Sequence, residues 1–232
     1  MSNIFRDFAP LYWSAGLQAI PLRVGNKMPI IGDWSKWNRE RINEDVKNGW
    51  LESFPDSNVG VCPGALSNIC FVDIDIWDKE LLAKVEAILP PSPWRRIGAK
   101  GCVLAYKWCD TKSFKVVESE DSLNRRVAVD ASARKIGVEF FSSSGQVVMP
   151  PSIHPDTKQP YASNCNLWEV IDQLVVIDGA TLERKIRDVL KLSGVRPEIR
   201  GLSRLGDKVS KGSRDNTMIK LAGHLAYAVR KG

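Results

Sequence analysis

The segment from Phe71 to Trp77 constrains the fold more than any other part of the chain, because apolar and acidic residues alternate along it. Successive side chains of a β-strand point to opposite faces of the sheet. The apolar residues of this segment therefore enter a core, while Asp73 and Asp75 share the other face, with their side chains starting about 7 Å apart. The pattern predicts a strand with one buried face and one face that presents two carboxylates.

Two carboxylates held this close repel each other unless a cation lies between them. Such a strand can bind a pair of divalent ions about 3.5 to 4 Å apart, which activate one oxygen and stabilise another in phosphoryl transfer. The alternative is the solvent-facing side of a half-buried strand. Glu139, inside the apolar stretch Val138–Phe141, is the candidate for a third ligand, with Asp130 as its competitor. For Glu139 the alternative is an ordinary surface glutamate.

The composition is that of a soluble globular protein. The chain has 232 residues, 44% of them hydrophobic and 26% charged, which suits one domain of ordinary size or one domain plus a fragment. No run approaches the roughly 18 apolar residues of a spanning helix, and the first residues lack the order of a signal peptide. We therefore expect a cytoplasmic protein without a membrane partner. Five cysteines without a C-x-x-C pair argue against a disulfide framework or a zinc ribbon.

Basic residues are in excess, with a formal net charge of +6, and a segment from Ser193 to Arg214 supplies +4 of it. This excess permits a polyanionic partner without requiring one. The segment has no hydrophobic period and contains Gly and Ser. It is predicted to be a mobile basic linker that helps to retain nucleic acid.

Hydrophobic periodicity predicts helices and strands in an irregular order, without an internal repeat. Helices are predicted at residues 4–12, 43–50, 79–89 (capped by Asp78), 181–192 and after Ser213. Strands are predicted at residues 17–24, 59–61, 69–77, 102–108, 138–141, 146–149 and 174–177. The strands at 138–141 and 146–149 are expected to pair as a hairpin through Ser143-Ser144-Gly145.

Two further motifs carry possible phosphate contacts. The segment Arg95–Gly101 reads as a basic turn flanked by glycine, where Lys100 can meet a phosphate, while Arg95 and Arg96 are expected only to solvate the surface. His154 lies between two prolines, which restrict its backbone and suit a side chain presented to a ligand. A turn histidine bonded to a neighbouring carbonyl is the alternative. Ser152 lies nearby, but no acid completes a hydrolase triad.

The assembled pattern resembles the primase-polymerase (prim-pol) group of the archaeo-eukaryotic primase superfamily, found in phage and plasmid replication proteins. The resemblance runs from about residue 10 to residue 165. It rests on the order and spacing of several short motifs: Lys27-Met28-Pro29 with Trp34, Asn58-Val59-Gly60-Val61 with Gly64, Val72-Asp73-Ile74-Asp75, and Val138-Glu139 followed by Pro150-Pro151-Ser152. The segments Gly212–Thr217 and Leu221–Leu225 look like the start of the helical domain that follows in such primases.

The resemblance implies an α+β fold with an RRM-like antiparallel catalytic sheet, a small N-terminal α/β portion beside it and the start of a helical domain. The implied organisation is a catalytic domain at residues 1–178, a helix and basic linker at 179–212, and the start of a truncated helical domain at 213–232.

By position, Asp73 and Asp75 match the first acidic motif of the family and Glu139 the third, all of which bind metal, implying Mg²⁺ or Mn²⁺. Many members carry a histidine between these motifs that contacts the phosphates of the incoming nucleotide. This chain has Gly98-Ala99-Lys100-Gly101-Cys102-Val103 there and no histidine. The candidates for the nucleotide site are therefore Lys100, His154, Ser152 and Lys27.

The activity implied is that of a DNA primase/polymerase, a template-directed nucleotidyltransferase that uses nucleoside triphosphates on a single-stranded DNA template, with a fused or separate helicase as a further partner. Two other classes remain open. A two-metal nuclease uses the same three acids without triphosphates. A non-catalytic replication initiator that binds single-stranded DNA needs none of them.

Overall fold

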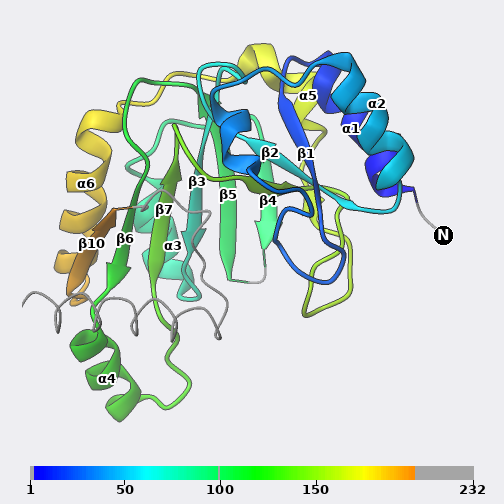
Figure 1. Ribbon diagram of the computed structural model, residues 1–232. Helices are drawn as coiled ribbons and strands as arrows, with labels where there is room; N and C mark the ends of the chain where they lie inside the picture. Colours follow the sequence, from blue (N-terminus) through cyan, green and yellow to red (C-terminus); the bar gives the residue numbers. More distant parts are fainter. Residues whose placement is uncertain (1–2, 99, 202–232) are drawn as a thin grey trace, which may run out of the picture. The chain divides into compact units, whose positions relative to one another are not determined.

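The computed structural model describes residues 3–98 and 100–201, which contain six α-helices and two antiparallel sheets (Figure 1). The predicted α+β class with antiparallel sheets is confirmed. None of the helices in these ranges is long and apolar enough to cross a membrane.

The smaller sheet has three strands in the order β1-β2-β8. They are β1 (Gln18–Leu22), β2 (Asn58–Cys62) and β8 (Val147–Met149). Helix α1 (Ile4–Ser14) packs on it, and the short 3-10 helix η1 (Trp34–Asn38) and helix α2 (Glu44–Ser53) connect β1 to β2. Ile4, Phe5, Ala9 and Tyr12 form the buried stripe of α1, which confirms the predicted N-terminal helix.

The larger sheet has seven strands in the order β10-β6-β7-β3-β5-β4-β9. Their bounds are β3 (Ile69–Asp75), β4 (Arg95–Gly98), β5 (Gly101–Lys107), β6 (Phe114–Glu118), β7 (Gly137–Phe141), β9 (Ala162–Ser163) and β10 (Pro197–Gly201). The remaining helices are α3 (Lys79–Glu86), α4 (Glu120–Val129), α5 (Leu167–Val170), the 3-10 helix η2 (Ile171–Gln173) and α6 (Gly179–Leu192).

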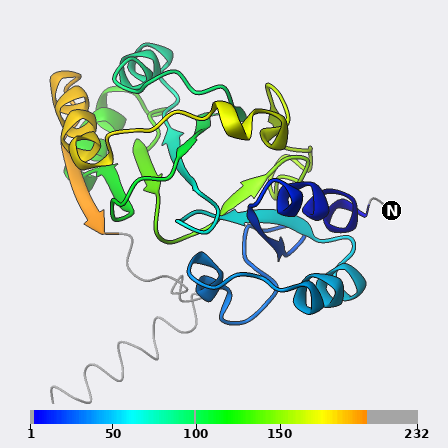
Figure 2. The ribbon, with the colours of Figure 1, turned by 90° about the horizontal axis from the view of Figure 1, so that it is seen from above.

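The two faces of the larger sheet are covered differently, as the view from above shows (Figure 2). Val72 and Ile74 of β3 belong to a core that also contains Leu81 of α3 and Ile186 of α6. Phe71, on the opposite face, belongs to a second core shared with the smaller sheet and α1. Asp73 and Asp75 follow Phe71 on this second face, so the acids lie beyond the apolar contact between the two sheets.

The predicted hairpin between residues 138–141 and 146–149 is wrong, because β7 belongs to the larger sheet and β8 pairs with β2 of the smaller one. The turn between them is held by other segments. The hydroxyl oxygen of Ser113 accepts hydrogen bonds from the backbone N–H groups of Ser142, Ser143 and Ser144 at 2.9, 3.0 and 3.2 Å. The chain therefore crosses from one sheet to the other here instead of folding back on itself.

The described structure continues beyond residue 178, where the catalytic domain is predicted to end. Leu182, Ile186 and Leu190 of α6 are buried in the core beneath the larger sheet. Within the segment predicted to be a linker, residues 197–201 form β10, which pairs with β6. Residues 202–214 of that segment and the helix predicted after Ser213 lie outside the described residues.

Gly101 begins β5 in a backbone conformation that favours glycine, with φ at +136°. A Cβ atom at this position would lie 1.8 Å from the backbone oxygen of Ile74. The close approach of these strands, which holds Asp75 opposite Gly101, therefore depends on the missing side chain.

We expect Gly101→Ala to lower the free energy of unfolding by about 3 kcal/mol or more, because both φ and the space disfavour a side chain. Urea denaturation followed by circular dichroism measures the change. Gly49→Ala in α2 is the matched control, since a Cβ there meets nothing within 4 Å, and we expect it to stabilise the protein by about 0.5–1 kcal/mol. Equal stability of the two variants would contradict the role of Gly101.

Candidate active site

The three predicted acids lie on one face of the larger sheet, on two adjacent strands. Asp73 of β3 is directly opposite Glu139 of β7 in the antiparallel register, and Asp75 is opposite Gly137. Directly opposed residues of an antiparallel pair project to the same side, with Cβ atoms about 4.5–5.5 Å apart. All three acidic residues are half-buried. The register thus brings together the acids that the sequence places in two separate motifs.

Each acid has a basic residue beside it. Glu139 forms an ion pair with Lys115, its register partner on β6. Asp75 forms one with Lys100 at 2.9 Å, and Asp73 lies 4.0 Å from the guanidinium of Arg96. These acids and bases lie on neighbouring strands of the larger sheet, from β6 to β4, or on the hairpin between β4 and β5. The positive charges of the basic residues offset the repulsion between the carboxylates.

Arg96 is a site residue that the sequence analysis missed. Only 9% of it is exposed, and its Nη1 donates a hydrogen bond of 2.7 Å to the carbonyl oxygen of Val148. Its guanidinium lies 4.7 Å from the centre of the Tyr161 ring, a favourable cation–π distance. The expectation that Arg96 only solvates the surface is wrong, because residues 95–98 form strand β4 instead of a turn. The fully buried Trp94, two residues earlier, is the signal in the sequence that points to this strand.

Two buried polar groups of this site, one on Arg96 and one on Tyr161, lack hydrogen-bond partners within the described residues. Nε of Arg96 and the hydroxyl of Tyr161 are buried, and within the described ranges neither has a hydrogen-bond partner. Buried polar groups are almost always paired with protein, water or ligand. These two groups are therefore unpaired donors buried beside the acidic face.

Lys27 and His154 belong to the same electrostatic neighbourhood. Burial lowers the pKa of Lys27, the charge of Arg96 lowers it further, and the charge of Asp73 opposes this. Burial also lowers the pKa of His154, with a further contribution from Lys27. The ring of His154 lies 5.0 Å from that of Tyr161, centre to centre. Lys27 and Lys100 thus lie near Asp73 and Asp75, and His154 lies near Lys27 and Arg96, although the two lysines and His154 come from three separate loops.

Burial raises the pKa of Asp73 above its ordinary value, and the charges of Arg96 and Lys27 only partly oppose this effect. A further cation at this carboxylate would lower the cost of its charge. Across residues 3–98 and 100–201, no three His, Cys, Asp or Glu side chains are grouped as a metal site. The carboxylates of Glu139 and Asp75 are instead bonded to their lysine partners.

The structure does not bring Ser152 or Asp130 to the acids in this way. Ser152 is fully buried, and its hydroxyl accepts a hydrogen bond from the N–H of Val59 at 2.8 Å and donates one to the carbonyl oxygen of Val59 at 3.2 Å. This side chain anchors the loop that carries His154 to β2. Asp130 is exposed at the end of α4, where its carboxylate accepts hydrogen bonds from Ser132.

We expect Arg96→Ala to destabilise the protein by about 2–4 kcal/mol, because the change removes a buried charged hydrogen bond and a cation–π contact. Arg95→Ala is the matched control. Arg95 lies next in the chain on the opposite face, where 36% of its side chain is exposed and it pairs with Glu86. Its loss should cost less than about 1 kcal/mol in the same urea denaturation. Similar losses for both arginines would contradict the role given to Arg96.

Comparison with known proteins agrees with this geometry. No curated protein matches the chain significantly. The family model for Prim-Pol, described as "Bifunctional DNA primase/polymerase, N-terminal", matches residues 9–174, which confirms the resemblance found in the sequence. The matched range contains all three acids together with Lys27, Arg96, Lys100 and His154. Because the match covers more than half of the chain, this protein belongs to the Prim-Pol family, an enzyme domain of the nucleotidyltransferase type that acts with DNA and nucleotides.

Proposed function

We propose that this protein is a DNA primase/polymerase that synthesises primers on a single-stranded DNA template and extends them by template-directed nucleotidyl transfer. The observation that carries the proposal is the register of β3 and β7, which sets Asp73 opposite Glu139 with Asp75 on the same face. Family membership supports the reaction class.

The carboxylate oxygens of the three acids are suitable ligands for divalent metal ions. Carboxylate oxygens are the ligands that Mg²⁺ and Mn²⁺ prefer. At Asp73 the charges of Arg96 and Lys27 only partly offset the cost of burying a carboxylate. Asp73, Asp75 and Glu139 would hold the ions, with Glu139 and Asp75 exchanging their bonds to Lys115 and Lys100 for bonds to metal. When bound, such ions activate an attacking hydroxyl and stabilise the leaving group of phosphoryl transfer.

The basic residues around the acids are proposed to bind the triphosphate. Lys100 and Lys27 contribute positive charge, and Arg96 has a buried Nε free to donate a hydrogen bond. Because Val148 and Tyr161 fix its guanidinium, Arg96 orients a phosphate with little loss of side-chain freedom. His154 contributes from the loop that Ser152 anchors, so Ser152 acts by positioning this loop.

The finer assignments rest on the family resemblance. The antiparallel strands that carry the acids, with helices on the opposite face, support the identification with the RRM-like catalytic sheet. Following the same resemblance, we propose that the protein serves phage or plasmid replication in the cytoplasm of a bacterial cell, with a fused or separate helicase, and that residues 213–232 begin a helical domain.

We expect Asp73→Asn combined with Asp75→Asn to lower primer synthesis at least about 10³-fold, because two of the three oxygen ligands for metal are lost. The assay supplies a single-stranded template, labelled nucleotides, and Mg²⁺ or Mn²⁺. Glu86→Gln, an acid on the opposite face, is the control and should retain synthesis. Full synthesis by the double variant would refute the proposal.

The same assay separates the alternatives. A two-metal nuclease would degrade labelled DNA without triphosphates, and the double variant would lose that activity. A non-catalytic initiator would bind single-stranded DNA and neither synthesise nor degrade it. Either result from the unaltered protein would replace the proposed function.

We expect Lys100→Ala to raise KM for the triphosphate about tenfold, equivalent to about 1.4 kcal/mol, with little change in template affinity. His154→Ala should act in the same direction. Lys84→Ala is the control, since Lys84 is an exposed lysine of α3 that pairs with Glu80. If Lys100→Ala weakens only template binding, Lys100 contacts DNA and Lys27 becomes the next candidate for the phosphate contact.

A further inference from the structure

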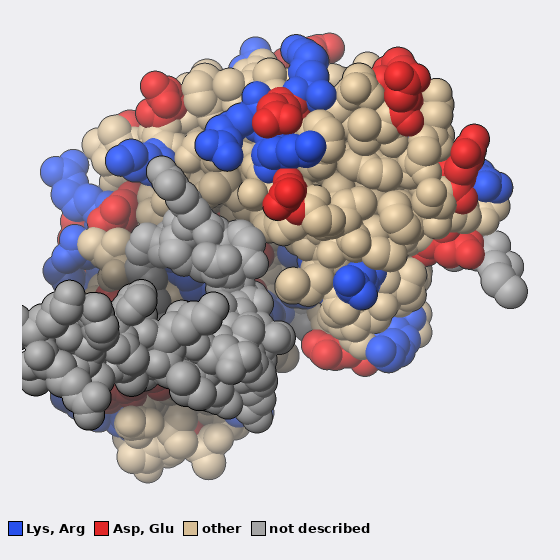
Figure 3. Space-filling model, in the orientation of Figure 1, with Lys and Arg blue, Asp and Glu red and all other residues tan. Residues whose placement is uncertain are grey.

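A second polar site lies away from the acids, between α4, the segment that leads into β10 and the start of α3. It is a pocket of about 480 Å³ whose lining includes Arg125 and Arg126 of α4 and Arg196. Basic and acidic side chains are interspersed over the face visible in Figure 3, so its excess positive charge does not form one continuous patch there. The three arginines of this pocket lie together, with Asp78 and Asp130 also in the lining.

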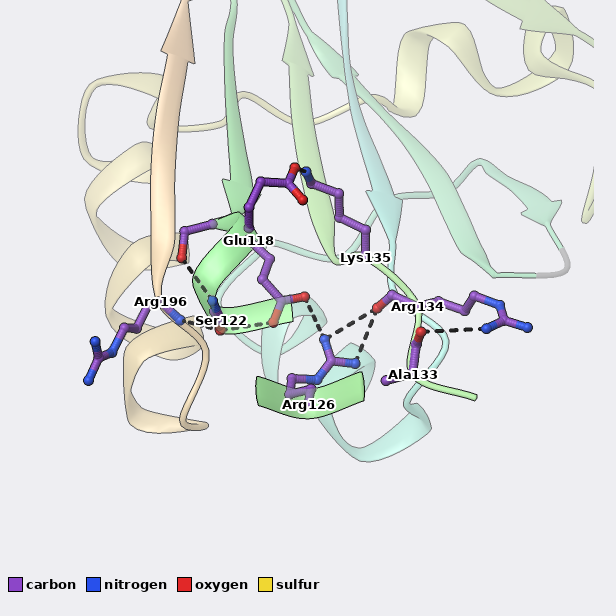
Figure 4. A network of polar contacts seen from close by, with 9 residues as sticks. Glu118, Ser122, Arg126, Ala133, Arg134, Lys135 and Arg196 are labelled. Atoms are coloured by element: carbon purple, nitrogen blue, oxygen red, sulfur yellow. Dashed lines mark hydrogen bonds and ion pairs between the residues drawn. The ribbon is translucent and has the colours of Figure 1, made fainter. Parts of the chain in front are cut away.

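Arg126 is held in place by a buried network, which Figure 4 shows. Its Nη1 lies 2.6 Å from the carboxylate of Glu118, whose side chain is fully buried, and Ser122 donates a hydrogen bond of 2.9 Å to the same carboxylate. Both Nη atoms of Arg126 also donate to the carbonyl oxygen of Arg134, at 3.2 and 3.1 Å. Burying a carboxylate is costly. Here the network fixes the direction of a guanidinium at the wall of the pocket.

Arg125 and Arg196 complete the basic lining. Both residues are exposed, and in the part of the chain that the structure describes no hydrogen bond or ion pair engages either guanidinium. The two aspartates of the lining accept hydrogen bonds from residues two or three positions further along the chain. Asp78 accepts a hydrogen bond from the N–H of Leu81 at 2.7 Å, and Asp130 accepts two from Ser132. The two exposed guanidinium groups are therefore available to an anion.

The pocket lies at the same end of the larger sheet as the acids. Asp75 pairs with Gly137, and Gly137 pairs with Val117, so β3 and β6 end together. Beyond that end, β6 leads into α4 and β3 leads into α3 (Figure 1). Asp78 of the pocket lining is only three residues from Asp75. Between them lies Trp77, which is 53% exposed and offers a surface on which a base can stack.

We propose that this pocket binds backbone phosphates of the single-stranded DNA on which the acids act. Guanidinium groups match the geometry of phosphate oxygens, and contacts of this kind hold a strand without reading its sequence. Val129, 91% exposed at the rim, and Trp77 supply the apolar surfaces that a strand of nucleotides also needs. The identification of the strand as the template rests on the proposed function.

A free triphosphate fits this pocket less well than a strand. Sites for triphosphates usually use backbone N–H groups to surround the phosphates. The N–H of Gly194, in the lining, already donates to the carbonyl oxygen of Lys191 at 3.0 Å. The pocket thus offers separate side-chain contacts, which suit successive phosphodiester groups.

The test is Arg125→Ala combined with Arg196→Ala in the full chain, which leaves Glu118 and Arg126 in place because their loss can unfold the region. Binding of a fluorescent single-stranded oligonucleotide is measured by anisotropy over a range of salt concentrations, without nucleotides and with EDTA. We expect the affinity to fall about tenfold and the salt slope to fall by roughly 1.4, as for two phosphate contacts.

The matched control is Arg6→Ala combined with Arg184→Ala, which removes the same charge from exposed arginines of α1 and α6. It should bind DNA almost as the unaltered protein does. Equal affinity of the two double variants would overturn the proposal, as would loss of labelled triphosphate binding with DNA affinity intact.

The result is independent of whether the protein synthesises DNA. The variant Asp73→Asn with Asp75→Asn should retain DNA binding and its full salt slope. A protein that binds DNA through Arg125 and Arg196 but makes no primers would support the pocket and count against the proposed function. If the unaltered protein synthesises primers but the variant lacking Arg125 and Arg196 binds DNA with unchanged affinity, the proposed function would be supported and the role of the pocket would be refuted.

Discussion

The antiparallel register between β3 and β7 is the constraint on which the site depends. It places Asp73 directly opposite Glu139, with Asp75 on the same face, and so concentrates three carboxylates on a partly buried surface. Such a concentration of charge is tolerated only with compensation. Lys115 and Lys100 supply it from β6 and from the hairpin between β4 and β5. The basic residues around the acids are therefore a structural requirement as well as a candidate binding surface.

The arrangement of the two sheets explains why the site draws on distant parts of the chain. The larger sheet buries one face under α3 and α6 and shares the other with the smaller sheet. After β7 the chain crosses to the smaller sheet, where β8 pairs with β2. This crossing brings the carbonyl of Val148 to Arg96 and the loop of His154 to Tyr161. The contact between sheets thus positions the basic and aromatic groups beside the acids.

The sequence predicts the local features well and the long-range ones poorly. Alternation along β3 places Asp73 and Asp75 correctly on one face, because side-chain period depends only on the strand itself. The hairpin joining 138–141 to 146–149 was a wrong prediction, since the serine turn fits a hairpin but its N–H groups are bound by Ser113, 29 residues before Ser142. Arg96 was missed because strand β4 has only four residues, too few for a clear period.

Charge exchange connects the resting arrangement with the proposed reaction. In the described structure Lys100 neutralises Asp75, and Lys115 neutralises Glu139. On the proposed function, Asp75 and Glu139 would hold metal ions in place of their lysine partners, and the ammonium of Lys100 would then be available to a phosphate. A lysine suits both tasks, because its flexible four-carbon stem carries a compact charge that changes partners without rearranging the backbone. On this proposal the side chain of Lys100 would stabilise Asp75 before substrate binds and a phosphate afterwards, whereas the hydrogen bond to Val148 fixes Arg96 in one place.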